Sequence, residues 1–171
     1  MWYSENIGTF NTARPFKYNG TSYPATAFKN PEVLESATIY PLRVENIAEP
    51  RYYTQGAMTR TFEDGMWVER YEAVPKDFDE LKKFLIKDWL HRLDGYLGNT
   101  DRFLTRSDEM ATYFSKWTIN PALQQWRDLV YQLFNAKMNS ITEAVTFEGL
   151  VTADKIDIDV PEQPVPYEVE E

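Results

Sequence analysis

Residues 61–85, TFEDGMWVERYEAVPKDFDELKKFL, contain the point at which the pattern of the chain changes from strand to helix. Asp64-Gly65 favours a tight type I′ turn, because both residues tolerate the positive φ that such a turn needs, so a hairpin is predicted over 52–74. Pro75 then ends the second strand. The stretch therefore predicts strands before residue 75 and helices after it.

The residues before this hairpin also predict strands and turns. Asn19-Gly20 is a second type I′ turn signal between two aromatic-rich runs. Pro31, preceded by Asn30, predicts a short helix with a capped first turn. Other candidate strands lie at 14–18, 21–25 and 39–44. We expect residues 1–75 to form a β-rich docking module.

Residues 76–148 have apolar side chains at helical spacing and predict a small three-helix bundle. Asp77 has the spacing of a capping box with the acid three residues further on. Gly95 and Gly98 predict the end of the first helix, and Asn120-Pro121 predicts the start of the last one. The three helices are expected at about 77–98, 107–117 and 120–143.

The final segment, residues 149–171, contains three prolines and many acidic residues. This composition predicts an extended acidic arm, with a candidate strand at 155–160. Taken together, the sequence predicts an α+β protein: a β-rich N-terminal module, a small three-helix bundle and an extended acidic C-terminal arm.

Composition limits the classes of partner. The chain has 171 residues, 27 acidic and 18 Lys or Arg residues and a net charge of −9, so it repels phosphate backbones and we expect no nucleic-acid partner. The absence of cysteine excludes disulfides and Cys-based zinc sites.

The first residues, MWYSENIGTF, do not resemble a signal peptide, and no apolar run approaches the ~20 residues of a membrane span. We expect a soluble protein made in the cytoplasm, with no membrane partner.

Candidate catalytic or metal-binding residues are few. His91 stands alone on a predicted helix, without an H-E-x-x-H pattern. Asp154, Asp157 and Asp159 lack the central Gly and terminal Glu of an EF-hand loop, so a solvated acidic edge is the preferred interpretation. We expect no enzyme activity, metal or cofactor. Two carboxylates brought together by the fold would still suit a glycoside hydrolase, and this alternative stays open.

Candidate partner-binding residues are apolar and lie near the two ends of the chain. Trp2 and Tyr3 either pack into the β module or anchor a neighbouring protein. The arm suits docking in extended form, by adding to a neighbour's sheet or by lying in a groove. Its candidate contact residues are Ile156, Ile158, Val160, Val165 and Tyr167. A separate alternative is a carbohydrate-binding module, in which aromatic residues such as Trp67 or Trp117 stack on sugars.

Several short motifs resemble a known type of protein. Residues 33–42, VLESATIYPL, follow the Asn19-Gly20 hairpin and are similar to the "el…GIyPv" stretch near the start of many small tailed-phage tail proteins. Ala37-Thr38 stands where that type usually has a pair containing Gly. The hairpin at Asp64-Gly65 resembles their "dG.wv..w.vv" strand pair. Residues 79–103 and the helix around Arg127 resemble their "l..lk…l…l..TDw…r..E" and "yR..lR" helical segments.

The resemblance implies a non-enzymatic structural role in the virion, at the distal tail of a bacteriophage. It implies an adaptor of the baseplate or tail fibre that docks onto larger tail proteins, in several copies around a symmetric assembly. The alternative is a tail-fibre assembly chaperone that is not retained in the virion. The resemblance carries no catalytic residues to this chain.

Overall fold

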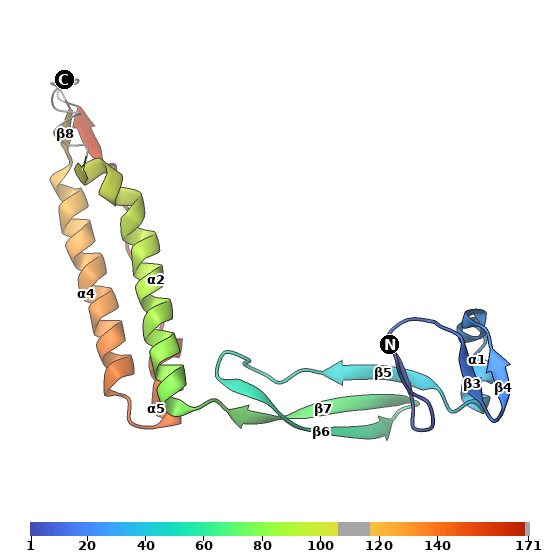
Figure 1. Cartoon of the computed structure of the whole chain (residues 1–171). Coiled ribbons are helices and arrows are strands. Elements are labelled where there is room, and N and C mark those ends of the chain that lie inside the picture. The colour runs from blue at the N-terminus through green and yellow to red at the C-terminus, as the bar shows by residue number, and fades with distance from the viewer. Residues whose placement is uncertain (106–116, 170–171) are drawn as a thin grey trace. The chain divides into compact units, whose positions relative to one another are not determined.

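The computed structural model describes residues 1–105 and 117–169 and confirms the α+β fold (Figure 1). The chain divides into two compact units, Met1–Pro75 and Lys76–Glu171. We call them the N-terminal unit and the C-terminal unit. Each has its own buried core, so each is described separately.

A five-stranded mixed sheet organises the N-terminal unit, in the order β2-β1-β5-β7-β6. β5 and β7 run parallel, whereas the other neighbours in this sheet are antiparallel. A separate pair of strands, β3 and β4, is followed by a 3-10 helix, η1 (Ala25–Lys29), and by α1 (Pro31–Ser36). The strands are β1 (Trp2–Ser4), β2 (Gly8–Phe10), β3 (Phe16–Tyr18), β4 (Thr21–Tyr23), β5 (Tyr40–Glu45), β6 (Tyr53–Glu63) and β7 (Met66–Pro75).

Both predicted tight turns are confirmed. Asn19 and Gly20 have φ values of 46° and 78°, and they join β3 to β4. Asp64 and Gly65 have φ values of 50° and 79°, and they join β6 to β7. Positive φ at both central positions is the type I′ geometry that these residue pairs favour.

The core of the N-terminal unit lies between the sheet and the segment from β3 to α1. Its buried residues are Phe10, Phe16, Ala27, Ala37 and Ile39, with Phe28 and Trp2 packed against them. Asn30 caps α1 as predicted, because its Oδ1 accepts a hydrogen bond from the Glu32 amide at 3.1 Å. Strands β1 and β2 were not predicted, since no Asn-Gly or Asp-Gly pair lies between them to indicate a hairpin.

Two long helices, α2 (Phe78–Thr105) and α4 (Pro121–Glu143), form a hairpin in the C-terminal unit (Figure 1). The predicted start of α4 is confirmed, with Asn120 Oδ1 accepting from the Ala122 amide at 2.9 Å. The helices bury a shared apolar seam. From α2 it contains Leu81, Leu85, Trp89, Leu93 and Leu97, and from α4 Leu123, Trp126, Val130, Phe134 and Ile141.

The predicted end of the first helix at Gly95 and Gly98 is wrong. Both glycines lie inside α2, and a Cβ at either position would meet no other atom. An exposed glycine costs a helix only about 1 kcal/mol relative to alanine, and burial of Leu93, Leu97 and Thr100 outweighs that cost. The helix predicted over 107–117 falls largely outside the described residues, but Trp117 begins a strand, β8 (Trp117–Ile119).

The prediction of an extended arm from residue 149 is also wrong at its start. Residues Phe147–Lys155 form a third helix, α5. Thr146 caps it, because its Oγ1 accepts from the Gly149 amide at 3.1 Å, and Leu150 is fully buried. The candidate strand at 155–160 does not form. Residues 157–165 are extended without regular structure, and a strand, β9 (Tyr167–Val169), pairs with β8.

Candidate docking surfaces

Trp2 and Tyr3 belong to the sheet of the N-terminal unit. Trp2 lies edge-on to Phe28, with ring centroids 5.0 Å apart, on the side of the sheet that carries the core. Tyr3 points to the opposite face, where it contacts the Trp67 ring and lies under the Arg60 guanidinium. Both residues therefore pack into the β module, and contact of either one with a neighbouring protein stays a prediction.

The arm lies along its own helices rather than extending away from them. The Lys137 ammonium donates to the Ile156 carbonyl, Trp126 Nε1 donates to the Pro161 carbonyl at 2.8 Å, and the Asn120 amide donates to the Pro166 carbonyl at 3.0 Å. The three donors follow α4 backwards from its C-terminal third to its N-cap. The arm is therefore antiparallel to α4, and pairing of β9 with β8 fastens its end (Figure 1).

The spacing of these contacts requires an extended arm. From Lys137 to Trp126 the helix rises about 16 Å, at 1.5 Å per residue. Five residues of extended chain, from Ile156 to Pro161, span about the same length. Each proline also fixes one φ of the arm before it packs on the helices, which lowers the entropy lost on ordering.

A buried lysine closes the junction of α4, α5 and the arm. Lys137 is 5% exposed, and its ammonium donates to the carbonyls of Ala153, Asp154 and Ile156 at the end of α5. These carbonyls belong to the last turn of a helix, which lacks intrahelical donors and carries partial negative charge. The same ammonium lies 4.7 Å from the centroid of the Trp89 ring. Trp89 Nε1 donates to Asp154 Oδ1 at 2.7 Å, so helix α2 is included in the junction.

A second buried cation, Arg127, connects α4 to α2. Its guanidinium donates to the Leu97 carbonyl at 3.1 Å, to the Thr100 hydroxyl and to Asp101 Oδ1 at 2.7 Å. Sequence reasoning missed the roles of Arg127 and Lys137. A signal was present, because both lie on the apolar stripe of α4 at spacings of three or four residues from Val130 and Phe134. A cation on such a stripe indicates a buried and paired charge.

The predicted contact residues of the arm have different environments. Ile156 and Val165 are 60% and 68% exposed, Ile158 and Val160 are half-buried, and Tyr167 lies in β9. Val160 lines an open hollow of about 600 Å³ with Trp126, Tyr96 and Arg92, and Ile156 and Ile158 line a second hollow of about 260 Å³. Docking of the arm on a neighbour stays a prediction.

The candidate residues for chemistry are dispersed. His91 is exposed on α2, and Asp77 caps that helix, accepting from the Glu80 amide at 2.9 Å. Asp154 is buried, whereas Asp157 and Asp159 are exposed. Across residues 1–105 and 117–169 no cluster of three or more His, Asp or Glu side chains has the geometry of a metal site.

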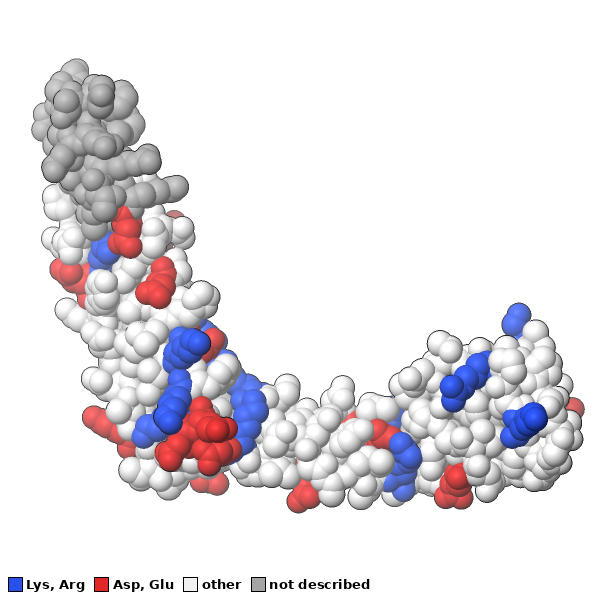
Figure 2. All heavy atoms as spheres, viewed as in Figure 1, with Lys and Arg blue, Asp and Glu red and all other residues white. Residues whose placement is uncertain are grey.

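One face of the sheet carries a ladder of charges around Arg70. Its guanidinium contacts Glu63 at 2.6 Å and Glu45 at 2.8 Å. The hydrogen bond from Arg70, assisted by one from Thr61, lowers the pKa of Glu63 to about 2. The pKa of Glu45 is also lowered, chiefly by its own hydrogen bond from Arg70. Acidic and basic side chains also lie next to one another on the surface in view in Figure 2.

No family model, curated protein or solved structure matches the chain in the comparisons made. Among the described residues, no helix has both the length and the apolar character needed to cross a bilayer.

Proposed function

We propose that the protein is a non-enzymatic structural adaptor of a bacteriophage tail, located in the virion at the baseplate or tail fibre after synthesis in the host cytoplasm. The observation that carries the adaptor role is the division into two compact units at Pro75 and Lys76, each with its own core. A connector needs two separately folded surfaces, one for each partner.

The turns, strand pairing and buried hydrogen bonds inside each unit favour two rigid units. In the N-terminal unit, type I′ turns fix the register of both hairpins, and the β6–β7 pair extends over about ten residues a strand. In the C-terminal unit, the buried Lys137 and Arg127 hold the arm and the helices together. Rigid parts lose little conformational entropy on docking, which favours tight assembly.

The phage tail setting rests on the resemblance of the sequence motifs. The motif at 33–42 covers the junction of α1 and β5, and the motif at Asp64-Gly65 covers the β6–β7 turn. The partners in this proposal are larger tail proteins. A symmetric tail presents identical sites to several copies of a small adaptor.

Quantitative mass spectrometry of purified virions, combined with cross-linking, tests the proposal. A fixed ratio of this protein to a baseplate or fibre subunit, with cross-links from both units to tail proteins, is the expected result. Abundance in the lysate and absence from the particles would overturn the virion role. In that case binding to unassembled fibre would distinguish an assembly chaperone from an unrelated protein.

A further inference from the structure

Four aromatic rings gather on the face of the N-terminal sheet opposite its core. The rings of Tyr3 and Trp67 lie 5.4 Å apart, those of Phe62 and Trp67 5.3 Å, and those of Tyr40 and Phe62 4.8 Å, all edge-to-face. Cross-strand register explains the cluster, because Tyr3 pairs with Tyr40 and Phe62 with Trp67. Phe62 remains 48% exposed.

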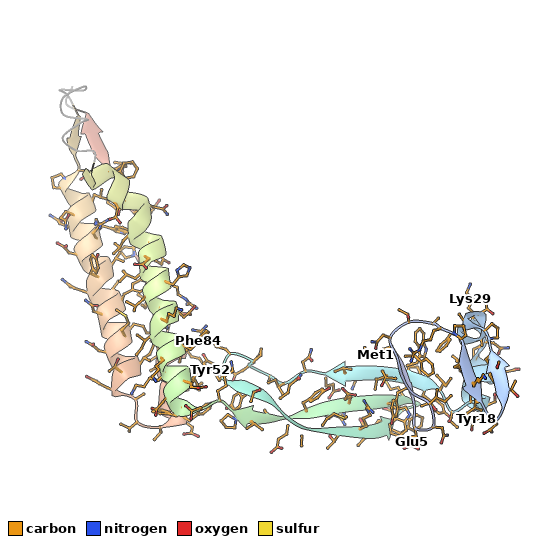
Figure 3. All side chains as sticks on the ribbon, in the orientation of Figure 1. Met1, Glu5, Tyr18, Lys29, Tyr52 and Phe84 are labelled. Carbon is orange, nitrogen blue, oxygen red and sulfur yellow. The ribbon has the colours of Figure 1, made fainter. Side chains whose placement is uncertain are left out.

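A hollow of about 260 Å³ lies beside these rings. Tyr40, Phe62 and Trp67 form its apolar side, and Glu5, Asn6 and Thr38 form its polar side. Figure 3 labels Glu5 at the turn between β1 and β2, beside the β6–β7 turn. The hollow therefore combines aromatic rings with a carboxylate, an amide and a hydroxyl.

Thr38 holds an unfavourable backbone conformation at the edge of this hollow. Its φ is 53°, in the left-handed region where a β-branched residue is a genuine outlier. It follows α1 at the position that helix C-termini usually give to glycine. Its hydroxyl accepts from Asn6 Nδ2 at 3.2 Å and lies 3.3 Å from the Ser4 hydroxyl. Strained backbone conformations of this kind cluster at functional sites.

We propose that this hollow binds a neutral sugar, held between the aromatic rings and the polar groups of Glu5, Asn6 and Thr38. Sugar rings present apolar C–H faces that pack against aromatic rings, and hydroxyls at their edges. A carboxylate accepts hydrogen bonds from hydroxyls, and an amide both donates and accepts them. The volume is below the ~300–1,000 Å³ of pockets that enclose drug-sized ligands, which favours one terminal sugar residue over a buried chain.

Other ligands fit the hollow less well. An anion would meet the Glu5 carboxylate on a chain of net charge −9, and no Lys or Arg lines the hollow. An apolar protein surface would cover Glu5 and Asn6 without offering partners, and buried polar groups without partners are costly. Sugar binding does not depend on the phage tail proposal.

A glycan array probed with the labelled full-length protein is the first experiment, followed by saturation-transfer NMR with free glucose, galactose, mannose and N-acetylglucosamine. Binding to neutral glycans above sialylated ones is expected. Phe62→Ala should weaken it at least tenfold, whereas Phe84→Ala, which truncates an equally exposed ring on α2 (49%), should not change it.

Thr38→Gly separates binding from folding. Glycine adopts the positive φ without strain and lacks the hydroxyl. The melting temperature should therefore hold or rise while sugar binding falls. The proposal is overturned if neutral sugars do not bind, or if Phe62→Ala and Asn6→Ala bind as tightly as the parent. It is equally overturned if Phe62→Ala splits a dimer in light scattering, because a second copy would then cover the rings.

Discussion

Replacement of Lys137 by methionine tests whether the buried ammonium holds the junction of α4, α5 and the arm. Methionine keeps an unbranched apolar stem but removes the ammonium, which donates to the carbonyls of Ala153, Asp154 and Ile156 and lies over the Trp89 ring. Lys137 is 5% exposed, so water would not replace the lost hydrogen bonds freely.

The magnitude follows from two opposing terms. A hydrogen bond to a charged group contributes about 1.5–3 kcal/mol net, and a buried carbonyl left without a donor costs about 1–3 kcal/mol. Methionine recovers part of this, because it avoids the desolvation of an ammonium. We expect Lys137→Met to lower the free energy of unfolding of the C-terminal unit by about 2–4 kcal/mol.

Guanidinium titration followed by circular dichroism at 222 nm measures this loss, because the long helices belong to the C-terminal unit. For a unit of about 100 residues, each kcal/mol corresponds to about 4–8 °C in melting temperature. Lys83→Met is the matched control, since Lys83 is exposed on α2 and its loss should change stability by less than about 0.5 kcal/mol. Equal stability of the two variants would refute the reasoning.

Three further perturbations have defined outcomes. Arg70 lowers the pKa of Glu63 from 4.5 to about 2, so this pair stabilises the fold above pH 4.5 and the stabilisation is lost as the pH falls toward 2. Glu63→Gln should therefore make the stability of the N-terminal unit depend less on pH across this window, as measured by acid unfolding. Trp126→Phe removes the hydrogen bond to Pro161, and limited proteolysis should cut the arm faster; an unchanged rate would argue against its clamping role. Gly65→Ala forces a side chain into a φ of 79°, and thermal melts should show a loss of about 1–2 kcal/mol from the N-terminal unit with no change in the signal of the helices.

The elements that could be predicted from the sequence are those with local causes. Asp64-Gly65 and Asn19-Gly20 determine their turns through their own backbone preferences, and Asn30 and Asn120 accept hydrogen bonds from amides two residues away. The three-residue strand β1 shows no alternation long enough to detect. It pairs with β2 on one side and, on the other, with β5, which lies 37 to 39 residues later in the chain in the Tyr3–Tyr40 and Trp2–Pro41 pairs.

The third helix had a local signal that was overlooked. Thr146 before the helix, Glu148 in its first turn and Lys155 in its last turn are all typical of helix ends. Gly149 and the prolines further on favoured an extended chain in the prediction. The contact of Trp89 with Asp154 spans 65 positions, so no local pattern contains it.

The antiparallel course of the arm has a mechanical consequence. A pull on the C-terminus along the α4 axis, away from Lys137, strains the contacts at Ile156, Pro161 and Pro166 together, because all three resist sliding in the same direction. A pull across the axis would break them one after another, beginning at β9. The same bonds would thus hold under an axial load and release under a sideways one, so the direction of force would decide when the arm leaves the helices.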